Sequence, residues 1–470
     1  MSNSVFVEMH CHPSLKPFGR SYPEDENSKN LFSKSSVWHR NAPNPLTKIL
    51  NKTLSITRFT QSDFKSMAMG SINVACISLY PLERNFLVSK LGQGALVDIL
   101  SDWVIGIGQQ KVNFIQENKN YFSELIKEMQ FIEQLHDKKV RIGFKKWKYK
   151  LVVNYREILQ NLESGERVIS VIPSIEGAHA FMIDNRNEPD TDSVMNNIDQ
   201  VLAWKYKPFF ISPAHHFYNY MCGHAYSLSQ GLRIILDQKT GVNTGITLLG
   251  WKIIEKLLAN RVYIDIKHMS RQARREYYKL LSKPEYNHIP VIISHGAVNG
   301  RPTVQSNDDH DEENGKFFGS DINFYDDEIV NLAKSKGLFC IQLDEKRIVS
   351  KTERKKADDI LLPAKKLEFR AGFVWNQVEH IACILDTAGT AAWDCVSIGS
   401  DNDGIIDPIE GFWTSGEIPK LRSYLFKHAK KFAESAPTRM KEKDNHISPE
   451  RIIDKLFGEN ALEFLKKFYV

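Results

Sequence analysis

The feature that most constrains the fold is a series of short apolar runs, rich in β-branched residues, that are typical of buried strands. The runs are 5–12, 72–80, 168–175, 208–214, 262–267, 291–294, 338–343 and 396–399. Segments with helical periodicity lie between them, for example 248–260, 271–282 and 326–336, and Ser270 is predicted to cap the second of these helices. Eight strands alternating with helices predict an α/β fold, a (β/α)8 or TIM barrel, with residues 1–470 as a single domain.

Two segments do not fit this eightfold pattern. Residues 13–60 are polar and rich in proline, and residues 84–160 contain a long helical stretch followed by a basic run at 138–150. We expect both to be insertions at the rim of the barrel, after the first and second strands. The basic run alternates cationic and apolar residues, as a nucleic-acid surface with aromatic stacking would. A solvated hairpin whose lysines protect an edge strand is the interpretation we favour.

The overall charge indicates what kind of partner to expect. A formal net charge of +5, from 62 basic and 57 acidic side chains, is a small excess, and it gives no strong case for nucleic acid or for a membrane surface. We therefore expect a small-molecule substrate, with a homo-oligomer left open. The six cysteines form no C-x-x-C pair, and the first residues lack the basic and apolar regions of a signal peptide. Reduced thiols and a cytoplasmic location are predicted.

Five of the apolar runs place a metal-type ligand at the end of a strand, where barrel enzymes have their active sites. The first run ends in His10-Cys11-His12. Because side chains alternate along a strand, the two imidazoles point the same way and Cys11 points the opposite way. The other four runs end in Glu176, His268, His295 and Asp401. This spacing predicts a hydrolytic metal site.

The residue types at these ends suggest separate roles. Glu176 precedes Gly177, which lets the backbone turn away and leaves the carboxylate projecting into the mouth of the barrel, where it could bridge two ions. His268 and His295 are single imidazoles at strand ends, and they could complete the shell of a second ion. Asp401, at the end of the eighth run, could take a proton from a metal-bound water.

Six motifs of this chain also occur, in the same order and with matching spacing, in a known family. They are Glu176-Gly177-Ala178-His179, Gly-Ile-Thr-Leu-Leu-Gly at 245–250, Asp-Ile-Lys-His-Met-Ser at 265–270, Ser294-His295, Gly-Ser-Asp-Asn-Asp-Gly at 399–404 and Gly-Glu-Asn-Ala at 458–461. They resemble Glu-Gly-x-His, Gly-Leu-Thr-x-x-Gly, Asp-Leu-Ser-His-x-Ser, Ser-His, Gly-x-Asp-Phe-Asp-Gly and Gly-x-Asn of the renal or membrane dipeptidases, peptidase family M19 of the amidohydrolase superfamily. The resemblance spans nearly the whole chain.

The resemblance implies two divalent metal ions, which we expect to be zinc. It places His10 and His12 on one ion, His268 and His295 on the other, Glu176 as the bridge and Asp401 as the general base. It also implies a histidine that contacts the tetrahedral intermediate, for which His215 is preferred over the adjacent His216. For the arginine that binds the substrate carboxylate in the family, Arg301 is the nearest candidate, although the local pattern there differs, and an arginine that faces solvent is the alternative. We add Asn219 as a substrate-binding residue, and we expect His179 to orient a ligand or to pack beside one.

The chain departs from the family at its first motif, where the dipeptidases carry His-Asn-Asp and this sequence has His12 in the third place. The metal cluster becomes more positive, which should lower the pKa of bridging water further. The insertions and residues 405–418 would rebuild the pocket rim, so the substrate is less certain than the reaction. We predict a dipeptidase-like amide hydrolase that uses a metal-bridging hydroxide. Hydrolysis of a cyclic amide or a lactone, or a non-catalytic metal-binding scaffold, are the alternatives.

Overall fold

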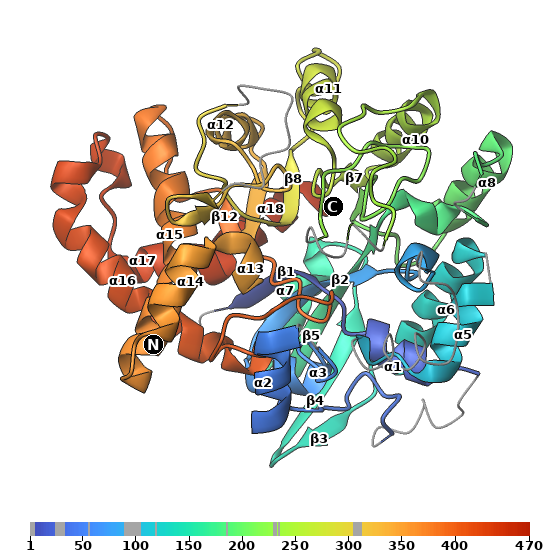
Figure 1. The fold of residues 1–470 in the computed structure, drawn as a ribbon, viewed down its shortest axis with the longest axis horizontal. Helices are drawn as coiled ribbons and strands as arrows, with labels where there is room; N and C mark the ends of the chain where they lie inside the picture. Colours follow the sequence, from blue (N-terminus) through green and yellow to red (C-terminus); the bar gives the residue numbers. More distant parts are fainter. Residues whose placement is uncertain are drawn as a thin grey trace.

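A computed structural model describes residues 5–23, 33–54, 57–88, 105–117, 120–184, 187–228, 233, 236–303 and 313–470. The fold is mixed α/β, with parallel strands at the centre and helices outside (Figure 1). One group of parallel strands is β1 (Phe6–Cys11), β2 (Ile72–Leu79), β5 (Arg167–Glu176), β6 (Phe210–Ser212) and β7 (Tyr263–Ile264), and a second is β8 (Ile292–Gly296), β11 (Leu338–Ile341) and β12 (Val396–Ile398). A strand forms in each of the eight predicted runs, so those predictions are confirmed.

Isolated parallel bridges connect these two groups of strands. Asp265, directly after β7, pairs with Ile292 of β8. At the other end Cys11 of β1 pairs with Asn402, a few residues after β12. The backbone N–H of Asp401 donates to the carbonyl of His10 at 2.9 Å, which fixes the loop after β12 beside β1. The strand ends that carry the predicted ligands therefore lie side by side.

The basic run forms the antiparallel hairpin of β3 (Val140–Ile142) and β4 (Lys145–Leu151), so the predicted hairpin is confirmed. β4 continues in parallel along the first half of β5, while β6 pairs with the last two residues of β5. Because β5 is ten residues long, it can pair with β4 and with β6 along different parts of its length. The Lys148 ammonium lies 2.9 Å from an Asp137 oxygen and 2.7 Å from a Glu166 oxygen, so the charge of this lysine is paired within the chain.

The predicted helices form as α10 (Leu248–Ala259), α11 (Arg271–Leu281) and α12 (Asp326–Lys334). Ser270 caps α11 as predicted, because its hydroxyl accepts from the N–H of Ala273 at 3.0 Å. The other α-helices are α1 (Leu15–Arg20), α2 (Pro45–Leu54), α3 (Phe64–Met69), α5 (Gln109–Glu117), α6 (Tyr121–Glu133), α7 (Tyr155–Glu163), α8 (Thr191–Leu202), α13 (Glu345–Ile348), α14 (Lys351–Asp358), α15 (Pro363–Thr387), α16 (Ile418–Arg439), α17 (Pro449–Asp454) and α18 (Asn460–Phe468). Short 3-10 turns occur at 84–86, 178–181, 415–417 and 443–445, two short strands, β9 (Glu313–Asn314) and β10 (Phe317–Phe318), pair with each other, and a π-helical turn at 455–459 precedes α18.

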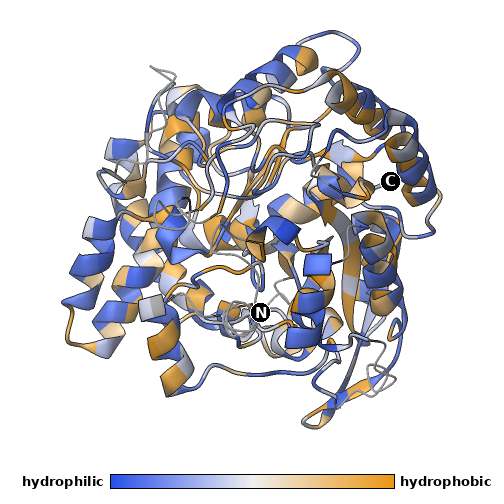
Figure 2. Cartoon of the chain, turned by 45° about the vertical axis from the view of Figure 1, so that its right-hand side comes forward, coloured by the Kyte–Doolittle hydropathy of each residue, from blue (hydrophilic) through white to orange (hydrophobic). Residues whose placement is uncertain are grey.

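Two faces of the strands contribute to different cores. Ile264, Ile266 and Ile341 pack into the main core beneath the helices, and Figure 2 shows the apolar strands inside a shell of more polar helices. Cys340, between two such positions, packs instead into a second core with Val7 and residues of α18. The alternation of side chains along the strands therefore separates an outer, helix-covered face from an inner one.

Asp403 ties the segment that follows β1 to the loop that follows β12. Its carboxylate lies 2.7 Å from the Lys16 ammonium and accepts hydrogen bonds from the N–H groups of Gln61 and Ser62 at 2.9 and 2.7 Å. Burial raises the pKa of Asp403, but Lys16 and these hydrogen bonds outweigh it and hold the pKa below its ordinary value. This buried pair anchors α1 and the turn before α3 beside the ligand-bearing strand ends.

Within the described residues, no helix is both long enough and apolar enough to span a lipid bilayer.

Candidate metal centre

His10 and His12 lie on the same side of β1. Their Nε2 atoms are 3.1 Å apart and both rings are buried. Cys11 packs in the main core on the other side, with its thiol against the carbonyl of Cys76. The alternation predicted for these three residues is therefore confirmed.

Glu176 lies at the centre of the cluster, as the last residue of β5. Its Oε2 is 3.1 Å from His12 Nε2, and its Oε1 is 3.6 Å from His10 Nε2. Burial raises the pKa of this carboxyl, but the interactions with His215 and His10 outweigh it, so the pKa lies well below its ordinary value. Gly177 has a φ of +86°, and a Cβ there would lie 2.3 Å from His179 Nδ1, so only glycine allows this turn.

His268 and His295 form a second pair opposite the first. Their Nε2 atoms are 3.1 Å apart, and each lies 3.3 Å from Glu176 Oε1. Burial and the neighbouring His215 together lower the pKa of His268 to about 3. Burial and the neighbouring His10 likewise hold the pKa of His295 well below its usual range. Both imidazoles are therefore neutral, which is the form that binds metal ions.

A serine and an aspartate that belong to two of the motifs, but to which the sequence analysis gave no role, hold two of these rings. The Ser294 hydroxyl donates to Asp265 Oδ2 at 2.6 Å, and it lies 3.0 Å from His10 Nδ1 and 2.9 Å from His295 Nδ1. Since the hydroxyl has a single proton and Asp265 takes it, a ring nitrogen that bonds to this hydroxyl must be the donor. The proton then sits on Nδ1, and the Nε2 lone pairs of both rings face Glu176.

Asp401 lies at the open side of the cluster. Its Oδ1 is 3.4 Å from His12 Nε2 and 3.8 Å from His10 Nε2, and its Oδ2 is 4.0 Å from His295 Nε2. With 13% of its side chain exposed, it is the most accessible member of the group. Burial lowers the pKa of His12, but hydrogen bonds to Asp401 and Glu176 outweigh it and raise the pKa to about 10.

His215 reaches the cluster and His216 flanks it. His215 Nε2 is 3.5 Å from Glu176 Oε2, whereas the His216 ring packs against His215 and His268 and its Nδ1 bonds to the Ser227 hydroxyl. His215, His216 and His268 also form a group whose ligand atoms lie within 4.8 Å of one another.

The partner of His215 is Glu83, which the sequence analysis missed. Its Oε2 lies 2.7 Å from His215 Nδ1, and its Oε1 accepts from the N–H of Phe217 at 3.1 Å. Burial raises the pKa of Glu83, but His215 and His179 outweigh it and lower the pKa to about 2. Burial lowers the pKa of His215, and Glu176 and Glu83 more than offset that effect. The position of Glu83, shortly after the second apolar run, was the only available signal in the sequence.

Three other predicted residues lie outside the cluster of ligand atoms. His179 bonds to the carbonyl of Pro81 at 2.8 Å and stacks on His215 with ring centroids 6.3 Å apart. The Asn219 amide bonds to the carbonyl of Pro213 and to the N–H groups of Met221 and Cys222, so it shapes its own loop. In the described residues no hydrogen bond or ion pair links the Arg301 guanidinium to the cluster, and its buried Nε has no hydrogen-bond partner.

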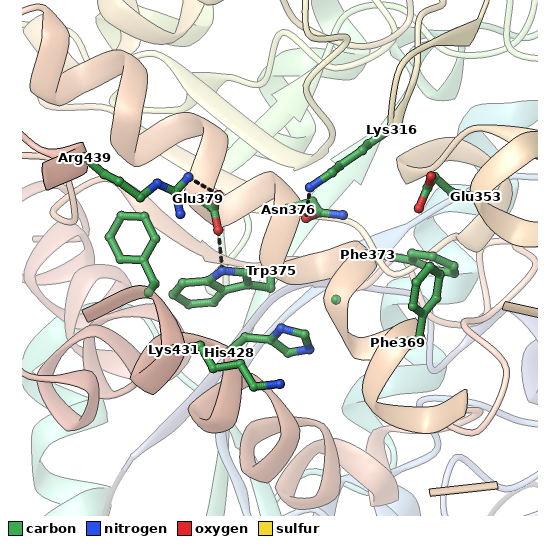
Figure 3. Close-up of a pocket in the computed structure, with 12 residues that line it drawn as sticks. Lys316, Glu353, Phe369, Phe373, Trp375, Asn376, Glu379, His428, Lys431 and Arg439 are labelled. Carbon is green, nitrogen blue, oxygen red and sulfur yellow. Dashed lines mark hydrogen bonds and ion pairs between the residues drawn. The ribbon is translucent and has the colours of Figure 1, made fainter. Parts of the chain in front are cut away.

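A separate hollow of about 350 Å³ lies between α15 and α16, and none of its lining residues belongs to the cluster (Figure 3). Its polar groups are largely occupied by one another, since Trp375 Nε1 donates to Glu379 at 2.7 Å and Arg439 pairs with the same carboxylate. At the strand ends, by contrast, His10, His12 and Asp401 form one possible metal-binding group and His10, Glu176 and His295 another.

No protein-family model and no curated protein matches this sequence, whereas several solved structures match its fold. Dipeptidase AC, a metallo peptidase of family M19, aligns over 99% of both chains with a TM-score of 0.56 at 13% identity. A metallo peptidase from Rhodobacter sphaeroides, liganded with a phosphinate mimic of L-Ala-D-Ala, gives 0.55 at 13% identity, also over 99% of both chains. The probable dipeptidase PvdM from Pseudomonas aeruginosa gives 0.50 at 14% identity, over 87% of this chain and 89% of that one. The fold is therefore that of M19 metallo dipeptidases over nearly the whole chain.

Proposed function

We propose that this protein is a binuclear metal-dependent hydrolase that cleaves an amide bond in a small, dipeptide-like substrate. The observation that carries the proposal is the pair of facing imidazole pairs around the buried Glu176 carboxylate. The M19 fold and the dipeptide mimic bound by the Rhodobacter sphaeroides relative support it. We further propose that the eight parallel strands close into a (β/α)8 barrel, with residues 13–60 and 84–160 as rim insertions. The two isolated parallel bridges support that closure.

The spacing of the donor atoms fits a metal ion in each pair. Imidazole nitrogens bind zinc at about 2.0–2.1 Å, so two of them on one tetrahedral ion lie roughly 3.3 Å apart. The observed separations, 3.1 Å between His10 and His12 and 3.1 Å between His268 and His295, are close to this value. Glu176 Oε1 is buried and has no hydrogen-bond partner in the described residues, as expected for an oxygen that binds a cation.

In this proposal His10 and His12 would hold one ion, and His268 and His295 would hold the other. Glu176 would contribute a ligand oxygen to each, since its Oε2 faces His12 and its Oε1 faces His268 and His295. We propose zinc, because neutral imidazoles and one carboxylate suit it. When bound, two such ions polarise the substrate carbonyl and lower the pKa of a water molecule.

Asp401 is the proposed general base. It is the only carboxylate of the cluster that is partly open to the outside, and its two oxygens face both histidine pairs. It can accept a proton from the attacking water and return it to the leaving amine. His215 is the proposed stabiliser of the oxyanion, because Glu83 fixes its Nδ1 and directs its Nε2 toward the reacting centre. Arg301 and Asn219 stay candidates for substrate binding.

The test is metal reconstitution followed by a hydrolysis screen. Elemental analysis of the reconstituted protein should give close to two ions per chain, and a His268→Ala variant should lose at least one of them. His428→Ala is the matched control, because His428 lies in the hollow between α15 and α16 and should leave both ions in place. The screen should include dipeptides, cyclic amides and lactones. A wild-type protein that binds no more than traces of metal, or that hydrolyses none of these substrates, would contradict the proposal.

A further inference from the structure

One buried cation beside the metal centre forms no hydrogen bond in the part of the chain that the structure describes. Lys267 precedes the ligand His268, it is 1% exposed, and its Nζ has no hydrogen-bond partner there. A buried ammonium that lacks such a partner carries a desolvation cost. Asp401, Asp265 and Glu176 lie close enough to attract its charge, and Arg347 lies close enough to repel it.

Lys267 lies in the turn that follows β7, close to the metal centre. Ile264 and Ile266 pack into the helix-covered core, whereas Asp265 points the other way and bonds to Ser212 and Ser294. The charge of Lys267 acts on the neighbouring His268 and on His295. Lys267 lies two residues beyond Asp265, past the carboxyl end of the strand, where a substrate would enter.

A second buried donor without a hydrogen-bond partner lies at the end of β11, the strand that pairs with β8. Gln342 follows β11, and its N–H bonds to the carbonyl of Gly296, the residue after the ligand His295. Phe339 and Ile341 pack into the main core, so Cys340 and Gln342 occupy the inner face. The Gln342 side chain is buried and its Nε2 lacks a hydrogen-bond partner among the described residues. The inner face at the ends of β7 and β11 thus presents two buried donors without acceptors.

The surrounding charge favours an anion there. The half-buried Arg347 of α13 lies close enough for its charge to lower the pKa of both Lys267 and His216. Two divalent ions would carry more positive charge than Glu176, Asp401 and a hydroxide neutralise. Bound ions would engage Glu176 and Asp401, which would leave the Lys267 ammonium and the Gln342 amide as buried donors without an acceptor. The acceptor would then come from the ligand.

We propose that Lys267 and Gln342 together form a subsite for an anionic group of the substrate, a carboxylate close to the scissile bond. This inference rests on the proposed function and specifies its substrate class. It assigns the carboxylate to the strand ends of β7 and β11, whereas the resemblance described above assigned it to Arg301. In the subsite, the ammonium donates to a carboxylate oxygen and the Gln342 amide donates to the same group.

The test measures binding to the metal-loaded protein by calorimetry, with two probes. One is a phosphinate dipeptide mimic with a free carboxylate, and the other is its carboxamide. The wild type should prefer the carboxylate form by about tenfold to a hundredfold, the factor that one charge-assisted hydrogen bond provides. Lys267→Met should abolish this preference, Gln342→Leu should reduce it, and the exposed control Lys431→Met should leave it unchanged. A preference that survives in Lys267→Met but is lost in Arg301→Gln overturns the proposal.

Protein stability gives a second readout that does not depend on hydrolysis. Lys267→Met should leave Tm of the ligand-free protein unchanged or raise it, because the substitution removes a buried charge that forms no hydrogen bond in the described residues. The matched control is Lys16→Met, which should lower Tm because Lys16 is also buried but pairs with Asp403 at 2.7 Å. A fall in Tm for Lys267→Met as large as that for Lys16→Met would overturn the subsite.

The subsite and the proposed function can fail separately. If the wild type hydrolyses amides and Lys267→Met keeps the full carboxylate preference, only the subsite is wrong. If the preference is present and depends on Lys267 while no amide is hydrolysed, only the proposed function is wrong. Binding of neither mimic to the wild type overturns the subsite whatever the hydrolysis screen gives.

Discussion

At the scale of single residues, the cluster separates groups that can bind metal from groups that can move protons. The four histidines and Glu176 are buried and face one another, whereas Asp401 retains an exposed edge. Ser294 and Asp265 fix the tautomers of His10 and His295 from behind. This division of roles leads to two predictions about carboxylates.

Asp401→Asn should keep its metal and lose activity. The amide retains the size of the side chain but cannot accept the proton of a water molecule, so kcat should fall by roughly two orders of magnitude or more. Steady-state kinetics and elemental analysis of the same preparation measure both effects. Near-normal turnover in this variant would remove Asp401 from the mechanism.

Glu83→Gln should impair His215 without touching the metal. The carboxylate that holds His215 Nδ1 at 2.7 Å becomes a neutral amide, and the loss of such a supporting partner typically costs about tenfold to a hundredfold. We expect this loss in kcat, with KM and metal content nearly unchanged. A parallel loss of metal would instead show that Glu83 supports the ligands themselves.

At the scale of elements, the strand ends are held in place by short polar caps and turns. The N-cap of α3 is Asp63, whose carboxylate accepts from the N–H of Ser66 at 2.8 Å and from the hydroxyls of Ser66 and Thr60. This helix precedes β2, and the turn before it is bound by Asp403. A substitution of Asp63 should therefore change the free energy of unfolding of the protein.

Asp63 gives a prediction about pH. Burial raises its pKa in the folded protein from 3.8 to about 6, although hydrogen bonds to Ser66 oppose the shift. Because the folded pKa is the higher one, the contribution to stability is full below pH 3.8 and is lost as the pH rises through about 6. Asp63→Asn keeps the cap but removes the charge, so it should gain Tm relative to the wild type between pH 4 and pH 7. Differential scanning calorimetry across that range measures the gain, and a constant difference in Tm would contradict it.

At the scale of the whole molecule, the proposed metal ions would join strands that are far apart in the chain. The donor atoms come from β1, β5 and β8 and from the residues after β7 and β12. Bound ions would therefore act as cross-links between the two groups of strands, in addition to the isolated bridges that connect them.

Metal removal should therefore lower the stability of the fold. A ligand present at a hundred times its Kd stabilises the folded state by about 2.7 kcal/mol, so chelation of the proposed ions should lower Tm measurably. Thermal denaturation with and without a chelator measures the effect, and zinc should restore it. His268→Ala should respond less to the chelator. An unchanged Tm after complete metal removal would show that bound ions do not stabilise the fold.

The sequence by itself determined the features that depend on neighbouring residues. Strand positions followed from local apolar runs, the common side of His10 and His12 followed from the two-residue period of a strand, and the cap at Ser270 followed from its place before a helical pattern. The strand ends that carry the ligands were visible for the same reason, since each ligand directly follows its own run.

Only the tertiary structure decided which of these side chains contact one another and which have no hydrogen-bond partner in the described residues. Glu83 and His215 are 132 residues apart, and Lys16 and Asp403 are 387 apart, so no local pattern can reveal either pair. The pairing of β4 with half of β5, the support of His10 by Ser294 and the unpartnered Lys267 likewise depend on which strands become neighbours. The physical reason is that strand order is set by burial and hydrogen bonding over the whole chain, whereas helix, strand and cap preferences are set within a few residues.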